Sequence, residues 1–185
     1  AWADALARVA PAYPYRKVLS RGDPYGMALL SRWPLQRVEA VDFAEDGLPS
    51  LVASVDLGGR PLQVIALHTH WPVFPELQAA RDRVLARAAA LAQTQPDATI
   101  LLGDLNLTPY APAFARLLTE SGLRDAFANQ AWRPTWQAGF WPLALPIDHV
   151  LLPAGSCVLA RSIGPDVGSD HRPLLVTLQL QPPPR

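Results

Sequence analysis

The sequence predicts a single α/β domain in which mixed β-sheets pack in layers against α-helices. Short apolar strand-like segments alternate with longer segments of helical period, two of the strands are joined by a tight hairpin turn, and one strand is apolar throughout. Of the 185 residues, 50% are hydrophobic and 17% are charged, a balance that supplies one substantial core. No repeat or change in composition marks a boundary, so we expect one domain over residues 1–181 and a Pro-rich tail over 182–185.

In the first half, apolar spacing and turn residues predict a helix over residues 1–9, a strand over 26–31, and a hairpin with arms 51–57 and 61–68. Gly58 and Gly59 between the arms supply the positive φ angles of a two-residue turn. Side chains alternate between the faces of a strand, so His68 and His70 share one face if the second arm runs that far.

In the second half, a long amphipathic helix is predicted from Glu76 to about Gln93, with Arg81, Asp82, Arg83 and Arg87 on its water-facing side. A short buried strand follows at 99–102, and then a helix at 113–121 with Gly122 as its stop. Three more strands are expected at 147–152, 157–163 and 173–180.

Charge and cysteine content narrow the classes of function. The formal net charge is +0 and the 16 Lys and Arg residues are scattered, so no basic stripe indicates tight binding to a nucleic-acid backbone. The single cysteine, Cys157, lies in an apolar segment and is expected to be a buried, inert thiol. No apolar stretch is long enough to span a bilayer, so the chain as given is expected to be a soluble domain.

Polar side chains stand at the ends of several predicted strands. Asp104 and Asn106 follow the buried strand with one residue between them, where both can project to the same side. Asp170 and His171 precede the last strand and pair a hard oxygen ligand with a titratable base, while Asp148 opens another strand, where a carboxylate can orient an imidazole.

Each of these groups also has a structural interpretation, because Asp and Asn commonly satisfy the backbone of turns. The tryptophans of the neighbouring loops have two interpretations as well. They form an apolar rim around a substrate, or they only pack the loops; they are Trp71, Trp132, Trp136 and Trp141.

Four motifs together resemble the endonuclease/exonuclease/phosphatase superfamily, which includes deoxyribonuclease-like enzymes, neutral sphingomyelinases and inositol-polyphosphate phosphatases. They are ALH at 66–68, GDLN at 103–106, PIDHVLL at 146–152 and GSDHRPL at 168–174, in family order and at similar separations. The resemblance also covers GMALLSRWPL at 26–35 and is nearest to bacterial members of unassigned substrate. It implies a four-layer α/β/β/α sandwich that cleaves phosphoesters by in-line attack of water with Mg²⁺ or Mn²⁺.

The resemblance also assigns roles. Asp104 and Asn106 correspond to the pair that orients water and a phosphoryl oxygen, with Asp104 and Asp170 on the metal side. His171 corresponds to the base or transition-state stabiliser, which Asp148 orients. The remaining family histidine matches His68 best, with His70 as the fallback; His70 and Trp71 are then candidates for the pocket wall.

The resemblance fails at the start of the chain. Family members open with strands that end in an Asn and in a Gln-Glu motif, whose Glu is the principal metal ligand, and no such motif is present. The glutamates stand in other contexts, at Glu39, Glu45, Glu76 and Glu120. The sequence is therefore interpreted as a family member without its first strands, and these residues alone are expected to bind metal poorly and to be weakly active or inactive. On this interpretation, membrane helices can precede this domain in the whole protein, as they do in some relatives.

The function predicted from these arguments is divalent-metal-dependent hydrolysis of a phosphoester, with a phosphodiester preferred slightly over a phosphomonoester. Neutral charge and aromatic loops favour a small or lipid-like phosphoester over duplex DNA. The alternatives are an endonuclease and a non-catalytic binding module that kept the fold. The substrate, the localisation and the oligomeric state are left open.

Overall fold

The computed structural model describes residues 8, 10–130, 133–137 and 143–180. Its short elements are η1 (Ala10–Ala12) and η2 (Pro96–Ala98), and its α-helices are α2 (Pro75–Gln93) and α3 (Pro112–Ser121). The strands are β1 (Tyr15–Leu19), β2 (Met27–Ser31), β3 (Leu35–Val41), β4 (Ser50–Asp56), β5 (Pro61–His68), β6 (Thr99–Asp104), β7 (Leu123–Asp125), β8 (Asp148–Pro153), β9 (Cys157–Ile163) and β10 (Leu174–Gln179).

A six-stranded sheet in the order β3-β4-β5-β6-β8-β7 forms the centre of the structure. Strands β5 and β6 are parallel and joined through α2, whereas the other neighbouring pairs are antiparallel. The sheet is therefore mixed, as the sequence predicts. Its parallel pair ends with His68 beside Asp104, so two polar side chains meet where two buried strands stop.

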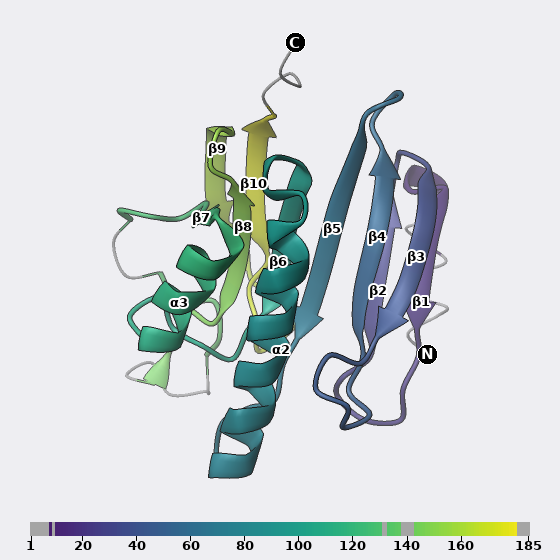
Figure 1. Ribbon diagram of the computed structural model, residues 1–185. Helices are drawn as coiled ribbons and strands as arrows, with labels where there is room; N and C mark the ends of the chain where they lie inside the picture. Colours follow the sequence, from purple (N-terminus) through teal and green to yellow (C-terminus); the bar gives the residue numbers. More distant parts are fainter. Residues whose placement is uncertain (1–7, 9, 131–132, 138–142, 181–185) are drawn as a thin grey trace.

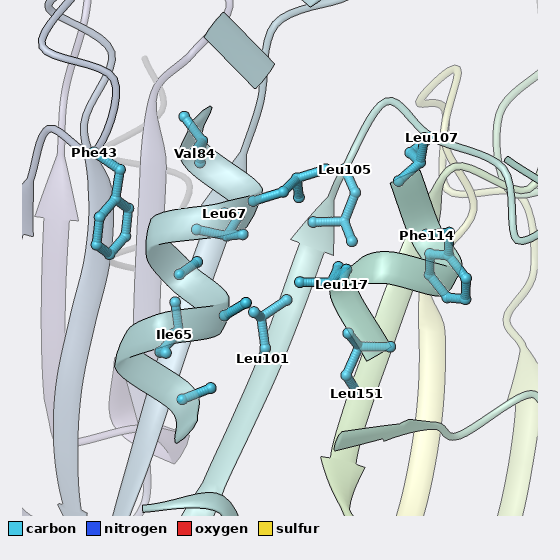
Figure 2. Packing of buried hydrophobic residues seen from close by; sticks show 14 of the residues in the cluster. Phe43, Ile65, Leu67, Val84, Leu101, Leu105, Leu107, Phe114, Leu117 and Leu151 are labelled. Atoms are coloured by element: carbon cyan, nitrogen blue, oxygen red, sulfur yellow. The ribbon is translucent and has the colours of Figure 1, made fainter. Parts of the chain in front are cut away.

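The main core lies between this sheet and the two α-helices, which lie on the same face (Figure 1). Figure 2 shows Ile65 and Leu67 of β5 with Leu101 of β6 packed towards Val84 of α2. Leu101 is completely buried, so truncation of such a side chain to Ala costs about 2–5 kcal/mol. This core makes the ends of β5 and β6 a rigid platform.

Two separate two-stranded antiparallel sheets, β1-β2 and β9-β10, lie across the other face of the central sheet. A second apolar cluster fills this interface, with Val64 and Ile100 among its buried members and Leu102, Val150 and Val176 only partly buried. Helices, central sheet and second sheet layer together form the expected α/β sandwich.

The hairpin prediction is confirmed by β4 and β5, with φ of 77° at Gly58 and 86° at Gly59. The face assignment is also confirmed, because Ile65 and Leu67 point to the helices while Val64 joins the opposite cluster. Helices α2 and α3 match their predicted ranges, and Gly122 ends α3 with φ of 68°. Strands β1, β3 and β7 are elements that the sequence analysis did not predict.

Two predictions about single residues are wrong. Arg81 does not lie on the wet side of α2 but is 6% exposed, because its guanidinium binds the carbonyl of Asn106 and the carboxylate of Asp82. Cys157 is exposed rather than buried, because it opens β9 at a position that faces solvent.

Some predictions concern residues outside the described ranges. These are most of the helix expected over residues 1–9, the tryptophans at 132 and 141, and the tail at 182–185. Within the described part, no helix combines the length and hydropathy that crossing a membrane requires.

Candidate active site

The floor of the site is formed where β5 and β6 end side by side. His68 and Asp104 are register partners, and Nε2 of His68 lies 3.6 Å from Oδ2 of Asp104. Both side chains are mostly buried, with exposed fractions of 27% and 14%. The two groups form an imidazole–carboxylate pair that is shielded from most of the solvent.

Gly103 allows these two strands to approach. A Cβ atom at this position would lie 1.9 Å from the carbonyl oxygen of Leu67, and φ is 133°. Only glycine accepts both the close contact and this backbone angle without strain. The first residue of the GDLN motif is therefore a packing requirement of the site.

The turn after β6 fixes Asp104 and Asn106 relative to each other. Oδ1 of Asp104 accepts a hydrogen bond from the backbone N–H of Asn106 at 2.8 Å, and Nδ2 of Asn106 donates to the carbonyl of Thr69 at 2.9 Å. Asn106 adopts a positive φ of 45°, which Asn tolerates better than most residues. Arg81 donates to the carbonyl of Asn106 at 3.1 Å and so holds the same turn from the helix side.

His171 reaches this floor from the loop before β10. Its Nδ1 is 2.8 Å from Oδ2 of Asp148, which leaves Nε2 directed towards Oδ2 of Asp104 at 3.8 Å. Asp148 is in turn fixed by the buried Thr135, whose hydroxyl oxygen accepts the backbone N–H groups of Ile147 and Asp148 at 3.2 Å each. The imidazole is therefore oriented by a carboxylate that is itself oriented by the backbone.

The pKa shifts follow from burial and from neighbouring charges. Burial raises the pKa of Asp104 to about 6, and the Asp148 carboxylate adds to this shift against the hydrogen bond from the Asn106 N–H. The hydrogen bond to Asp148 raises the pKa of His171, whereas burial lowers the pKa of His68, with the nearby His171 adding to that effect. The pKa values of the two imidazoles at the floor are therefore shifted in opposite directions from the same reference value.

The donor atoms also suit a small divalent cation. One ligand atom from each of Asp104, Asp148 and His171 lies within 4.8 Å of the others. The raised pKa of Asp104 reflects mainly its burial and, to a smaller extent, the nearby Asp148 and Asp170 carboxylates, and a bound cation would favour the ionised form. Carboxylate oxygens are the ligands that Mg²⁺ and Mn²⁺ prefer, so this donor set fits either ion.

Asp170 and His70 lie beside this cluster. Asp170 lines the same cleft and accepts a hydrogen bond from Nε1 of Trp136 at 3.2 Å. His70 lies beyond the end of β5 and turns to Oδ2 of Asp46 at 3.0 Å. The Tyr25 ring contacts both His68 and His70, at centroid distances of 4.8 and 5.5 Å. The two histidines are therefore neighbours, but only His68 contacts the carboxylate floor.

The floor of the site opens into a cleft of about 670 Å³, whose lining includes Trp71 but not His70, the other residue predicted for the pocket wall. Its polar lining includes His68, Asp104, Asn106, Asp170 and His171. Trp71 and Trp136 stand at its rim, with ring centroids 6.3 Å apart. The cleft therefore has a polar floor and an aromatic rim.

Thr135, Tyr25 and Arg81 are further parts of this site that no sequence motif indicated. Thr135 and Tyr25 come from loops without a motif, and their contacts depend on tertiary structure. For Arg81 a signal existed, because it stands four residues before Leu85 and seven before Ala88, on the apolar stripe of α2. The positive charge of Arg81 instead led to its prediction on the water-facing side of the helix.

The structure is an α/β sandwich whose carboxylates and histidines gather at the ends of its central strands. The family model described as "Endonuclease/Exonuclease/phosphatase family" matches residues 1–171. The chain belongs to this family, a group of metal-dependent phosphodiesterases and nucleases. No protein of curated function matches it at a significant level.

Solved structures show the same fold. Sphingomyelinase C from Streptomyces griseocarneus is 23% identical with a TM-score of 0.62, covering 94% of this chain and 77% of that one. D. rerio TDP2 complexed with single strand DNA product is 19% identical with a TM-score of 0.76, covering 96% and 81%. The human Nocturnin catalytic domain with bound sulfate is 15% identical with a TM-score of 0.74, covering 97% and 76%. At these identities the likeness extends to the fold alone.

Proposed function

We propose that this chain is a divalent-metal-dependent phosphodiesterase that uses in-line attack of water. The observation that carries the proposal is the oriented pair of Asp148 and His171, whose free Nε2 faces the buried carboxylate of Asp104 beside His68. Phosphoryl transfer depends mainly on positioning and on neutralising negative charge, and this cluster offers groups for both.

Each side chain then has a distinct role. Asp104, ionised above pH 6, accepts a hydrogen bond from the attacking water and orients it. The Asn106 amide, which donates to the Thr69 carbonyl and to Oδ2 of Asp104, holds that carboxylate in position. His171, whose pKa is raised by the hydrogen bond to Asp148, stabilises the charge that develops on the phosphoryl group. His68, whose pKa is lowered, remains neutral and donates one hydrogen bond to a phosphoryl oxygen.

Mg²⁺ or Mn²⁺ would be held by Asp104 together with Asp148, whose ligand atoms lie within 4.8 Å of each other, or with Asp170, which the family resemblance indicates and which lines the same cleft. When bound, such an ion polarises the phosphoryl oxygen and lowers the pKa of a coordinated water. None of the glutamates of the chain belongs to the Asp104–Asp148–His171 cluster. A donor set of this size supports weak metal binding and slow turnover.

A small or lipid-like phosphodiester is the favoured substrate. The cleft has aromatic rather than basic walls, and one solved structure of this fold is a sphingomyelinase. DNA is the alternative, because another solved structure of this fold is complexed with a DNA product. Nicking of supercoiled plasmid by this chain at a rate that exceeds small-ester hydrolysis would favour the nuclease.

The test is hydrolysis of bis(p-nitrophenyl) phosphate with Mg²⁺ or Mn²⁺, against EDTA, by the wild type and by His171→Ala. We expect a slow, metal-dependent rate that EDTA and the substitution both abolish. The matched control is His70→Ala, which removes an imidazole bound to Asp46 rather than to the floor and should retain most of the rate. An equal rate in EDTA or in His171→Ala contradicts the proposal. Absence of hydrolysis under every condition favours a monoesterase or a non-catalytic binding module instead.

A further inference from the structure

The cleft has two ends of different chemistry. The floor carries the charged and titratable groups, whereas the rim carries indole rings and apolar side chains, among them Trp71, Trp136, Leu145 and Ile147. A ligand held with its phosphate at the floor therefore extends an ester substituent over an apolar wall. The nature of this wall determines which substituents bind well.

Trp136 is fixed next to the reaction centre. Its Nε1 donates to Oδ2 of Asp170 at 3.2 Å, and its backbone forms isolated β-bridges with Leu145 and His171. The indole therefore has a defined position one hydrogen bond away from the polar floor. Its apolar edge remains part of the cleft lining.

Trp71 extends this wall outwards. It comes three residues after His68, its ring packs at 56° against that of Trp136, and its side chain is 57% exposed. A large aromatic ring that is exposed and held against a second ring is well placed to gain contact area from a ligand. Rings tilted in this way form one continuous surface rather than a slot between parallel faces.

The charges of the cleft indicate what the substituent is. The only Lys or Arg that lines it among the described residues is Arg81, and this guanidinium is 6% exposed and bound to Asp82 and to the Asn106 carbonyl. Among the described lining residues, no Lys or Arg is therefore free to pair with another phosphate of the substrate. A polyanion is disfavoured, and a singly charged phosphodiester with an apolar arm is favoured.

We propose that Trp71 and Trp136 form a binding subsite for an aromatic or similarly flat apolar substituent on the ester arm that does not leave. This inference rests on the proposed phosphodiesterase function and deepens it by naming a substrate class. Trp136 contributes through its fixed ring and Trp71 through its exposed face.

The test compares two substrates with the same leaving group, bis(p-nitrophenyl) phosphate and methyl p-nitrophenyl phosphate, in the wild type and in Trp71→Ala. The intrinsic reactivities of the two esters cancel when their ratio of kcat/KM is compared between proteins. We expect Trp71→Ala to lower the aryl-to-methyl ratio about tenfold, mainly through KM, as the loss of one aromatic contact surface predicts. Trp71→Phe should restore most of the preference.

Trp33→Ala is the matched control. Trp33 is 53% exposed, similar to Trp71, but it lies far along the sheet from the site. Its neighbour Pro34 accepts a hydrogen bond from the backbone N–H of Asp56, which pairs with the first residue of β5. His68 is at the opposite end of that strand. Removal of the Trp33 side chain should leave the ratio unchanged. If both esters are hydrolysed and Trp71→Ala leaves the ratio unchanged, the subsite is refuted while the phosphodiesterase function stands.

Binding separates the two proposals if no ester is hydrolysed. Calorimetric titration of the His171→Ala protein with diphenyl phosphate and with dimethyl phosphate, in the presence of Mn²⁺, requires no turnover. The subsite is supported, even where hydrolysis has failed, if the His171→Ala protein binds the diphenyl ester more tightly and the double variant with Trp71→Ala loses this preference. Equal binding of the two esters, or binding of neither, overturns it.

Discussion

Replacement of Asp104 by Asn should stabilise the metal-free protein at neutral pH and leave its stability unchanged in acid. Burial raises the pKa of Asp104 from 3.8 to about 6, so the folded state favours the protonated carboxyl. Below pH 3.8 the group is protonated in both the folded and the unfolded chain and contributes no penalty. Between pH 4 and 6 only the unfolded chain releases the proton, so folding becomes progressively less favourable. Above pH 6 the penalty is complete.

The magnitude follows from the size of the shift. Two pKa units at 1.36 kcal/mol each give a penalty of about 3 kcal/mol at pH 7, which the uncharged Asn side chain avoids. Asn retains an oxygen that can accept the backbone N–H of Asn106, so the turn after β6 should be preserved. We therefore expect the free energy of unfolding to rise by at most about 3 kcal/mol at pH 7 and by nothing at pH 3.5.

The assay is urea denaturation in EDTA at a series of pH values from 3.5 to 8. Asp97→Asn, which changes an exposed carboxylate in η2, is the control and should show no pH-dependent gain. Addition of Mn²⁺ should reduce the advantage of Asp104→Asn, because an ion that binds the folded wild type stabilises it by mass action. A gain for Asp104→Asn that is equal at pH 3.5 and pH 7, or a loss at pH 7, would refute the argument from a buried, uncompensated charge.

Three further predictions concern neighbouring groups. Gly103→Ala should destabilise the fold by more than about 3 kcal/mol, because its Cβ overlaps a backbone carbonyl of β5, and urea denaturation against Gly22→Ala measures this. His68→Gln should reduce kcat on bis(p-nitrophenyl) phosphate at least about tenfold, whereas His70→Gln should change it less than about threefold; equal losses would contradict the assignment. Asp148→Asn should lower the pKa of His171, since it removes the negative partner of Nδ1, and an NMR titration of the metal-free protein measures the shift.

The regular elements could be predicted where local chemistry and tertiary structure agree. Gly58 and Gly59 demand the turn that they form, and the apolar spacing in α2 matches the face that it buries. Strand β3 lies at the sheet edge, and its burial does not alternate cleanly. Strand β7 has only three residues, too few to show a period. These strands are defined by their partners more than by their own sequence.

Single-residue errors have the same origin. The charge of Arg81 predicted the water-facing side of α2, although its position in the helix falls on the buried stripe. There the Asn106 carbonyl accepts a hydrogen bond from the Arg81 guanidinium. Cys157 was placed by its usual preference for burial, although it opens a strand whose alternate side chains face solvent. In both cases the position in the fold, rather than the residue type, determines the exposure.

The main residues of the candidate site could be proposed from sequence because each stands at the end of an apolar strand. Asp104, Asp148 and His171 come from separate segments, and the structure groups their donor atoms within 4.8 Å. The supporting contacts could not be proposed in this way. Thr135 orients Asp148 from an irregular segment, and Tyr25 covers His68 from the loop before β2, so neither has a local signal.

Calorimetric titration of the 185-residue chain with Mn²⁺, run beside hydrolysis of bis(p-nitrophenyl) phosphate at the same metal concentrations, tests the central claim most directly. The account predicts that heat and rate follow one binding curve, and that Asp104→Ala abolishes both. Hydrolysis that saturates without metal binding, or metal binding that survives Asp104→Ala unchanged, would contradict a metal-dependent reaction at the ends of β5 and β6.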